Sequence, residues 1–162
     1  MLLFLKNLLF TVVVPGTVAV TVPLLAFSHA PVALAPSTVA GALLLLAGGA
    51  IYLWCLWDFA TFGRGTPAPI DPPKRLVVRG LYRHTRNPMY VGVLAVVVGW
   101  SLLFDSLPLA FYGLAVAGGF HLFVVLYEEP HLRRTFGPSY EEYCARVDRW
   151  IPSTKRAEGA PR

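Results

Sequence analysis

Four long apolar runs constrain the fold of this chain more than any other feature of its sequence. An α-helix needs roughly 17–25 apolar residues to cross a bilayer, and runs near that length lie at residues 5–27, 38–60, 88–104 and 108–128. The composition agrees, with 56% hydrophobic and 14% charged residues. The sequence therefore predicts an all-α integral membrane protein with about four transmembrane helices, in a single domain that covers residues 1–162.

Prolines and small residues in the first two runs predict how these helices bend and pack. Pro15, Gly16 and Pro23 interrupt the first run, and proline removes a backbone N–H from a helix. We therefore expect the first helix to be kinked. Gly41 and Gly48 in the second run should permit the close approach of a neighbouring helix.

The positive charges predict the orientation of the runs. All 14 Lys and Arg residues fall at the start of the first run, between the second and third, or after the fourth. Cytoplasmic segments are rich in Lys and Arg, so both termini, the loop 61–87 and the tail 129–162 are predicted to be cytoplasmic, in a multi-pass protein of the inner (cytoplasmic) membrane. The net charge of +5 is then explained by the membrane topology and by attraction to anionic lipid headgroups. No nucleic-acid partner is expected.

The most distinctive polar stretch leads into the third run and reads G-L-Y-R-H-T-R-N-P-M-Y-V-G, from Gly80 to Gly92. Asn87 is expected to cap this helix with its side chain, and Pro88 suits the first helical position. The basic cluster would then lie beside a positive helix end, where an anion can be held. Arg83 taken alone is explained by the general enrichment of arginine in cytoplasmic loops. The polar residues of this stretch taken together are interpreted as a binding site.

A second polar stretch, Glu128-Glu129-Pro130, stands where the fourth run ends. The third and fourth runs should form an antiparallel hairpin, because only the short turn at 104–108 separates them. Arg86 and Glu128 are therefore predicted to lie on the same side of the membrane and to form one site at its surface.

Other polar residues in or near the runs leave their roles open. His121 shares a helix face with Glu128 and is either functional or bonded to a backbone carbonyl. Asp58 is interpreted as a solvated acid at the end of the second run, with a role in the site as the alternative. Cys55 and Cys144 lack metal-ligand spacing, and no metal is expected.

The inner loop and the tail are predicted to lie over the site. Prolines in the loop at 61–79 favour a rigid cover. Beyond Gly137-Pro138, Ser139 is expected to start a cytoplasmic amphipathic helix, with Glu142 completing a capping box. One face of this C-terminal helix would carry apolar side chains that pack on lipid or close over the site. These side chains are Tyr140, Tyr143, Val147 and Trp150.

Three sequence patterns together resemble a known superfamily. They read G-x-Y-R-x-x-R-N-P-M-Y-x-G, then E-E-P-x-L-x-x-x-F-G-x-x-Y-x-x-Y one hairpin later, and finally W-I-P. In this order they are similar to the isoprenylcysteine carboxyl methyltransferases and phospholipid N-methyltransferases, and the segment from Gly63 to Pro73 is similar to bacterial members. The resemblance covers the last two-thirds of the chain, while the first two runs are generic.

The resemblance implies an S-adenosylmethionine-dependent integral membrane methyltransferase with a lipid-like or hydrophobic acceptor. It implies that Arg86 orients an anionic acceptor and that Glu128 or Glu129 accepts hydrogen bonds from the ribose or ammonium of the cofactor. Aromatic rings would face its adenine or sulfonium. The residues implied in catalysis are Arg86, Tyr90 and Glu128. The residues implied in cofactor binding are Tyr82, Asn87, Pro88, Tyr90, Glu128, Glu129, Leu132 and Tyr140.

The resemblance leaves the acceptor open. A carboxylate of the isoprenylcysteine type needs no base, whereas an aminophospholipid must lose a proton, with His84, His121 or a glutamate as the base. Asn87 stands where many members of the superfamily carry histidine, so no base is expected at that position. The oligomeric state is open as well.

Two other functions compete with this interpretation. A sterol-reductase-like, NADPH-dependent membrane oxidoreductase would share the P-x-Y-x-G pattern, but Met89 and Val93 stand where such enzymes carry asparagine and an acidic residue. A non-enzymatic four-span membrane protein would use the motifs for structure only. We expect the methyltransferase function in preference to both.

Overall fold

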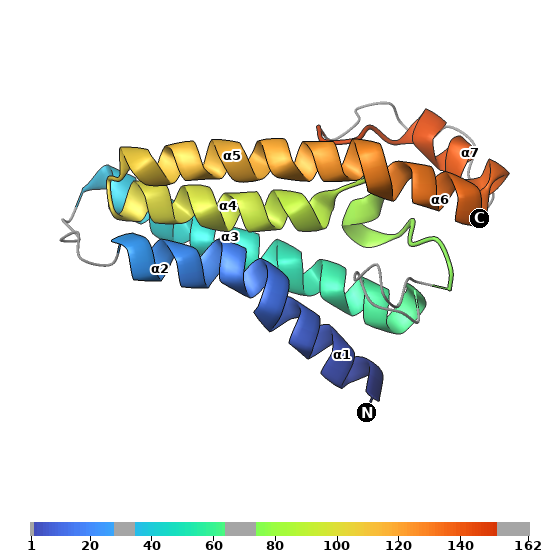
Figure 1. Ribbon diagram of the computed structural model, residues 1–162, viewed down its shortest axis with the longest axis horizontal. Helices are drawn as coiled ribbons and strands as arrows, with labels where there is room; N and C mark the ends of the chain where they lie inside the picture. Colours follow the sequence, from blue (N-terminus) through green and yellow to red (C-terminus); the bar gives the residue numbers. More distant parts are fainter. Residues whose placement is uncertain (1, 28–34, 64–73, 152–162) are drawn as a thin grey trace.

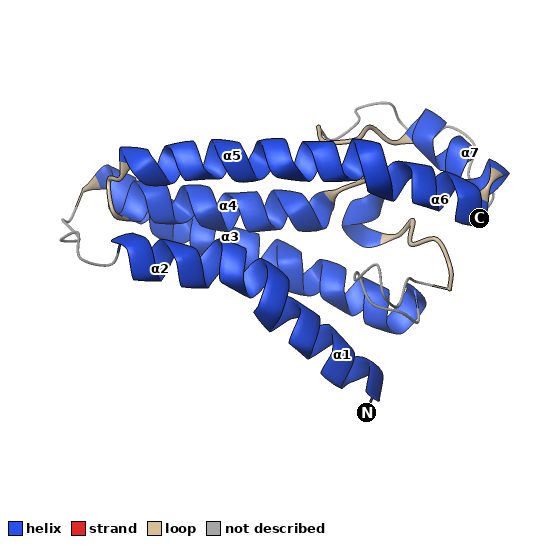
Figure 2. Cartoon of the chain, in the orientation of Figure 1, coloured by secondary structure: helices blue, strands red, loops and turns tan. Residues whose placement is uncertain are grey.

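The computed structural model describes residues 2–27, 35–63 and 74–151, and all regular structure within them is helical (Figures 1 and 2). The four predicted runs form four long helical segments. In chain order these are α1 (Leu2–Thr11) with η1 (Val12–Thr21) and α2 (Val22–Phe27); α3 (Pro36–Asp58) with η2 (Phe59–Gly63); α4 (Pro88–Leu103); and α5 (Leu107–Phe123) with η4 (Val124–Glu128) and α6 (Glu129–Phe136).

The apolar lengths of these segments confirm the all-α integral membrane fold. Three described helices are long and apolar enough to cross a membrane, namely Leu5–Ala26, Pro36–Gly63 and Leu107–Phe136. α4 is apolar but has only 16 residues, as the short third run predicted. The predicted loop cover at 61–79 lies largely outside the described residues, because residues 64–73 are not among them.

Glycines bring α3 and α4 into direct backbone contact. A Cβ added at Gly48 would lie 2.6 Å from the carbonyl oxygen of Gly92, and one added at Gly41 would lie 2.7 Å from that of Gly99. Both glycine pairs recur at seven-residue spacing on the two antiparallel helices, so one stripe of small residues faces another. The close approach predicted for Gly41 and Gly48 is confirmed.

The first helix is kinked, as expected from its prolines, and Figure 1 shows α1 leaning away from the bundle below η1. Pro23 has no N–H to offer the carbonyls four and five residues before it, which belong to Ala19 and Val18. Other helices satisfy both carbonyls: Trp100 Nε1 of α4 donates to Ala19 O at 2.9 Å, and Tyr112 Oη of α5 donates to Val18 O at 2.8 Å. These two hydrogen bonds therefore attach η1 to α4 and α5.

The fourth segment continues past the point where its apolar run ends. Glu128 and Glu129 were expected at the end of a helix, but the helix runs on through Pro130 to Phe136. The π-helical turn η4 stands directly before Pro130, and such a wider turn accommodates a residue without an N–H donor. The two glutamates therefore lie inside a continuous helix.

The tail forms α7 (Pro138–Arg146), which ends earlier than expected. Neither Ser139 nor Glu142 makes the predicted capping box, because the helix already begins at Pro138, with Gly137 before it at φ +50°. Tyr140, Tyr143 and Val147 do pack together, against Leu76, Leu132, Phe136 and Cys144. Figure 1 shows α7, α6 and the start of α1 at one end of the bundle, opposite the turn between α4 and α5.

Candidate functional site

The segment before α4 folds back over the end of α3. Gly80 adopts φ +57°, the left-handed region that favours glycine, and the 3₁₀ helix η3 (Gly80–Arg83) follows. A Cβ at Gly80 would collide with the carboxylate of Asp58. Asp58 is only 1% exposed and lies 3.0 Å from Arg79 Nε. The expectation of a solvated Asp58 was wrong, since the returning loop covers it; Asp58 fastens this loop and does not line the cavity described below.

Asn87 has a different task from the one expected. Its side chain makes no capping hydrogen bond to α4. Instead Asn87 Nδ2 donates to the carbonyl oxygen of Arg149 at 3.1 Å. Pro88 occupies the first helical position as predicted. The Asn87 side chain is therefore committed to the chain beyond α7 and not to the end of α4.

Residues Asp148, Arg149 and Trp150 form a C-terminal strap across this motif. The backbone N–H of Arg86 donates to Asp148 O at 2.9 Å, and Thr85 Oγ1 donates to Arg149 O at 3.0 Å. Together with the Asn87 bond, these contacts tie residues more than 60 positions apart. The strap thus fixes the backbone from which Arg86 and Asn87 project.

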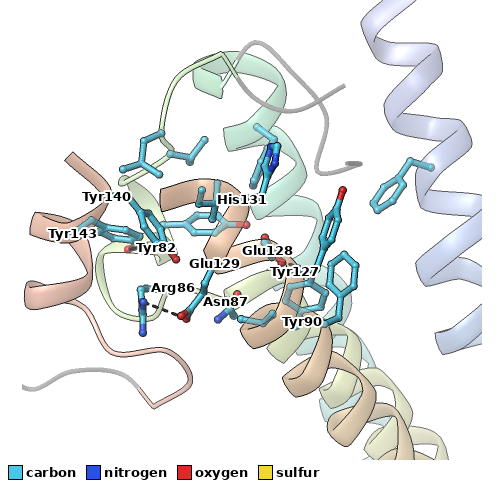
Figure 3. A pocket seen from close by; sticks show the side chains of 17 residues that line it. Tyr82, Arg86, Asn87, Tyr90, Tyr127, Glu128, Glu129, His131, Tyr140 and Tyr143 are labelled. Atoms are coloured by element: carbon cyan, nitrogen blue, oxygen red, sulfur yellow. Dashed lines mark hydrogen bonds and ion pairs between the residues drawn. The ribbon is translucent and has the colours of Figure 1, made fainter. Parts of the chain in front are cut away.

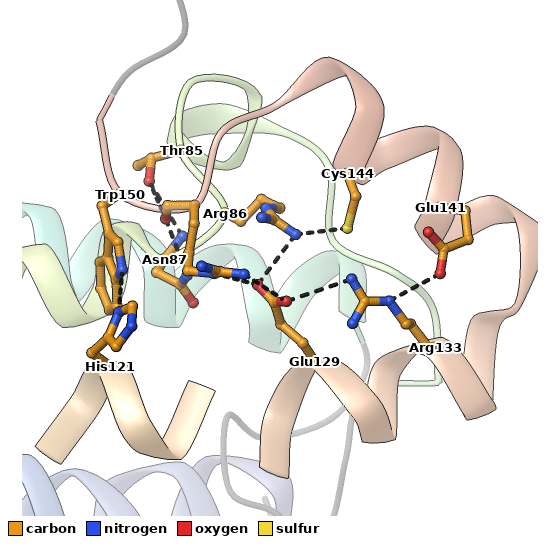
Figure 4. Close-up of polar contacts among 10 residues, drawn as sticks. Thr85, Arg86, Asn87, His121, Glu129, Arg133, Glu141, Cys144 and Trp150 are labelled. Carbon is orange, nitrogen blue, oxygen red and sulfur yellow. Dashed lines mark hydrogen bonds and ion pairs between the residues drawn. The ribbon is translucent and has the colours of Figure 1, made fainter. Parts of the chain in front are cut away.

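Glu129 is the centre of a buried ion-pair network (Figure 4). Arg149 grips it with two hydrogen bonds, Nε to Oε1 at 2.7 Å and Nη2 to Oε2 at 3.1 Å. Arg86 Nη1 lies 3.2 Å from Oε1, and Arg133 Nη2 lies 3.6 Å from Oε2. The hydrogen bond to Glu129 raises the pKa of Arg149 above its usual value, so Arg149 stays charged. The charge of Glu129 is fully matched within the protein.

Glu128 has a contrasting environment, although it is the preceding residue. Tyr90 Oη donates to Glu128 Oε2 at 2.7 Å. Within the described parts of the chain, no Lys, Arg or His side chain forms an ion pair with Glu128. Successive helix positions are turned by about 100°, so Glu129 meets the strap while Glu128 meets α4 and the cavity. Of the two carboxylates, Glu128 is the one that lines the cavity without a cationic partner in the described chain.

Trp150 completes the strap beside Tyr90. Its Nε1 donates to Nδ1 of His121 at 3.1 Å, and its ring meets that of Tyr90 edge-on at 6.4 Å between centroids. Tyr90 also packs against Phe120 at 4.7 Å. His121 therefore serves as an anchor for the strap, a task distinct from both alternatives considered from the sequence. His84 is exposed and lies outside the cavity lining.

α7 is held against η3 by buried tyrosines. Tyr143 Oη donates to the carbonyl oxygen of Tyr82 at 2.7 Å, and Tyr140 packs beside Tyr143 at 6.2 Å. Burial raises the pKa of both Tyr82 and Tyr143 above the ordinary tyrosine value. These rings are neutral, rigid walls and not acids or bases at physiological pH.

These elements enclose a cavity of about 950 Å³, its open mouth included (Figure 3). α1, η2, the motif segment, α4, the α5–α6 helix and α7 all contribute to its walls. The lining residues are Phe10, Phe59, Leu76, Val77, Tyr82, Arg86, Asn87, Tyr90, Phe123, Val124, Tyr127, Glu128, Glu129, His131, Leu132, Tyr140 and Tyr143.

The cavity gathers every predicted site residue except Pro88, which is buried in the first turn of α4. Sequence reasoning missed other contributors. Arg149 precedes the W-I-P pattern, but nothing in the sequence signals that it grips Glu129. Phe10 and Tyr127 sit in apolar runs, where a lining residue looks like any lipid-facing one. In the described residues, no group of three or more His, Cys, Asp and Glu side chains is placed to hold a metal ion.

Comparison with known proteins identifies the family. The model of the phospholipid methyltransferase family matches residues 36–139, well over half of the 162-residue chain. None of the curated proteins that were compared matches the chain. The matched region contains the whole first motif, Gly80 to Gly92, and the second motif as far as Ser139, and it ends before the strap. An all-helical membrane fold and a cavity at one end of its helices are both in keeping with that match, and the chain belongs to the phospholipid methyltransferase family.

Proposed function

We propose that this protein uses S-adenosylmethionine to methylate the amine headgroup of a membrane lipid. The observation that carries the proposal is the state of Glu128: it lines the cavity, accepts a hydrogen bond from Tyr90, and has no cationic partner in the described chain. A sulfonium donor and a protonated amine acceptor are both cations. A single uncompensated carboxylate between membrane-spanning helices favours binding of such groups.

The residues present fit the methyl donor. The lining carries Asn87, Glu128 and Glu129, whose polar groups suit a ribose or an amino-acid tail. Tyr82, Tyr90 and Tyr140 provide aromatic faces for adenine or for a sulfonium. Once bound, S-adenosylmethionine supplies a methyl group already activated on sulfur. The protein then has to align the acceptor with that methyl group and to exclude water.

The transfer forms a bond between the acceptor nitrogen and the methyl carbon, and it breaks the bond from that carbon to sulfur, which keeps the electron pair. An amine acceptor must lose one proton to expose its lone pair. Glu128 is placed to accept that proton, with Tyr90 holding its second oxygen. His131 also lines the cavity and offers a second acceptor.

A carboxylate acceptor is the second candidate, and Arg86 favours it. Arg86 Nη1 is committed to Glu129 and Cys144 Sγ, at 3.2 and 2.7 Å. Its buried Nε, however, has no hydrogen-bond partner among the described residues. An anionic acceptor would satisfy this donor after a small movement of the side chain. We favour the amine because Arg86 is already neutralised whereas Glu128 is not.

The orientation in the membrane is part of the proposal. The cavity lies at the end of the bundle that carries α6 and α7, the end to which the basic segments were assigned. We infer that this end is cytoplasmic and that the donor enters from the cytoplasm, with the protein in the inner membrane.

Calorimetric titration of the detergent-purified protein tests the donor. S-adenosylhomocysteine should bind in the micromolar range and NADPH should not. Glu128→Gln should weaken binding about tenfold or more, because a charged hydrogen bond contributes ~1.5–3 kcal/mol. Glu142→Gln makes the same change on an exposed face of α7 and should have no effect. Binding of NADPH alone would support the reductase, and binding of neither ligand by folded protein would support a non-enzymatic role.

Methyl transfer to two lipid classes tests the acceptor. Labelled methyl groups should pass to phosphatidylethanolamine in mixed micelles and not to a farnesylated cysteine carboxylate. The reverse preference would contradict the amine assignment and return Arg86 to the role of orienting an anionic acceptor.

A further inference from the structure

The cavity is lined by two chemically different sets of side chains. Charged and hydroxyl groups come from the motif segment and η4. Four aromatic side chains from separate helical elements, here called the aromatic wall, are Phe10 of α1, Phe59 of η2, Phe123 of α5 and Tyr127 of η4. A polar wall continuous with an aromatic wall suits an amphiphile better than a wholly polar solute.

We propose that Phe10 determines which apolar chains the methyl acceptor can carry next to its reacting headgroup. The inference rests on the proposed function and deepens it by assigning the chain of the acceptor to the aromatic wall. Among the described residues that line the cavity, Phe10 alone precedes residue 36. It therefore lies outside the segment that matches the family, at residues 36–139. Selectivity set by Phe10 belongs to this chain and is not implied by the family match.

Phe10 is held in place by its neighbours. The hydroxyl of Thr11 donates to Asn7 O at 2.7 Å, so the Tyr52 hydroxyl of α3, 2.9 Å away, must donate to Thr11. α1 also packs against η2. Further along the same helix, the hydrogen bonds from Trp100 of α4 and Tyr112 of α5 hold η1. A substitution at Phe10 therefore changes the shape of the wall without releasing the helix.

The aromatic wall reaches the lipid-facing surface of the protein. Phe123 and Tyr127 line the cavity and are also 38% and 47% exposed, and their neighbour Leu126 is 71% exposed. These residues belong to a helix that crosses the membrane by its length and composition. An acyl chain can thus extend from the cavity toward the bilayer along Phe123, Leu126 and Tyr127, and we assign the wall to a lipid chain on that ground.

Two acceptors with one headgroup test the inference. Dioleoyl phosphatidylethanolamine carries acyl chains, whereas glycerophosphoethanolamine has none. For Phe10→Ala, we expect the KM for the dioleoyl lipid to rise about tenfold, as for other losses of apolar contact in a binding pocket. Phe10→Leu should give a smaller rise. The KM for glycerophosphoethanolamine, and the affinity for S-adenosylhomocysteine, should change less than about twofold.

Leu9→Ala is the matched control, because Leu9 is the adjacent residue, is 63% exposed and does not line the cavity. It should leave both KM values unchanged. Equal KM changes for the two acceptors in Phe10→Ala, or an effect of Leu9→Ala as large as that of Phe10→Ala, would overturn the assignment.

Photo-crosslinking provides a readout that needs no turnover. Phosphatidylethanolamine with a diazirine in its acyl chain should label peptides that contain Phe10, Phe59 or Tyr127, and Phe10→Ala should reduce the labelling where Leu9→Ala does not. Labelling of this wall in a protein without methyl transfer would support a lipid-chain site beside Phe10 but refute the proposed function. Methyl transfer with labelling elsewhere and no chain-dependent effect of Phe10→Ala would refute the role of Phe10 alone.

Discussion

The buried ion-pair network predicts a graded loss of stability when its members are changed one at a time. Glu129 is 4% exposed and is surrounded by Arg86, Arg149 and Arg133, whose side chains are 11%, 32% and 44% exposed. The variants Glu129→Gln, Arg149→Lys and Arg133→Lys therefore remove interactions of decreasing burial. Because the three arginines share one carboxylate, their environments can be compared directly.

The expected magnitudes follow from burial and distance. Glu129→Gln leaves the buried Arg86 without its counter-ion, which should cost about 3–5 kcal/mol of unfolding free energy. Arg149→Lys keeps the charge but loses the two-point grip at 2.7 and 3.1 Å, and should cost ~1–2 kcal/mol. Arg133 is mostly solvated and 3.6 Å away, so Arg133→Lys should cost less than ~0.5 kcal/mol.

Thermal unfolding in detergent measures the series. About 2–4 °C of Tm per kcal/mol is usual for a chain of this size, so Glu129→Gln should lower Tm by ~6–20 °C and Arg133→Lys by at most ~2 °C. Arg149→Lys should fall between them and retain binding of S-adenosylhomocysteine, since the Arg149 carbonyl that accepts from Thr85 and Asn87 remains. Equal shifts for all three, or a larger shift for Arg133→Lys, would refute a network centred on buried Glu129.

Two further predictions concern packing and pH. Gly48→Ala should destabilise the protein by about 1–3 kcal/mol, because the new Cβ would lie 2.6 Å from Gly92 O. The control Gly49→Ala places its Cβ where nothing lies within 4 Å, so it should be neutral or stabilising. Equal effects of the two variants on Tm would show that α3 and α4 are not in backbone contact. Burial raises the pKa of Tyr143 above the value of about 10 that it has when unfolded, so unfolding releases protons at high pH. Stability should fall as pH rises above about 10. In melting curves recorded at several pH values, Tyr143→Phe should make this loss of stability less steep. An unchanged slope would show that groups other than Tyr143 cause the loss.

Much of the fold could be predicted because its signals are local. Apolar length and composition predict the helices, and the glycines at 41 and 48 predict where two of them meet. Counting the segments also predicted that Arg86 and Glu128 lie on one side, and both line the cavity. Helix ends were less accurate: the fourth run was expected to end at residue 128, but a π-helical turn before Pro130 carries the helix onward to Phe136.

The candidate site could be located from the sequence but not resolved into its parts. The roles of Arg86, Tyr90 and Glu128 in catalysis remain predictions that only binding and turnover can test. Asn87 was predicted as a helix cap, yet it binds the strap, because a buried hydrogen-bond donor takes whichever acceptor the fold brings near. That acceptor belongs to Arg149, 62 positions away.

The sequence alone determined the class of the protein, since crossing a bilayer demands apolar helices of a given length, and its motifs indicated the family. It could not distinguish Glu128 from Glu129, which are identical in chemistry and adjacent in the chain. The tertiary structure separates them: Arg149 and Arg86 neutralise one, while Tyr90 holds the other at the cavity. The reason is physical, because the charge that a carboxylate offers to a ligand depends on which residues surround it, and only folding across distant positions brings those residues together.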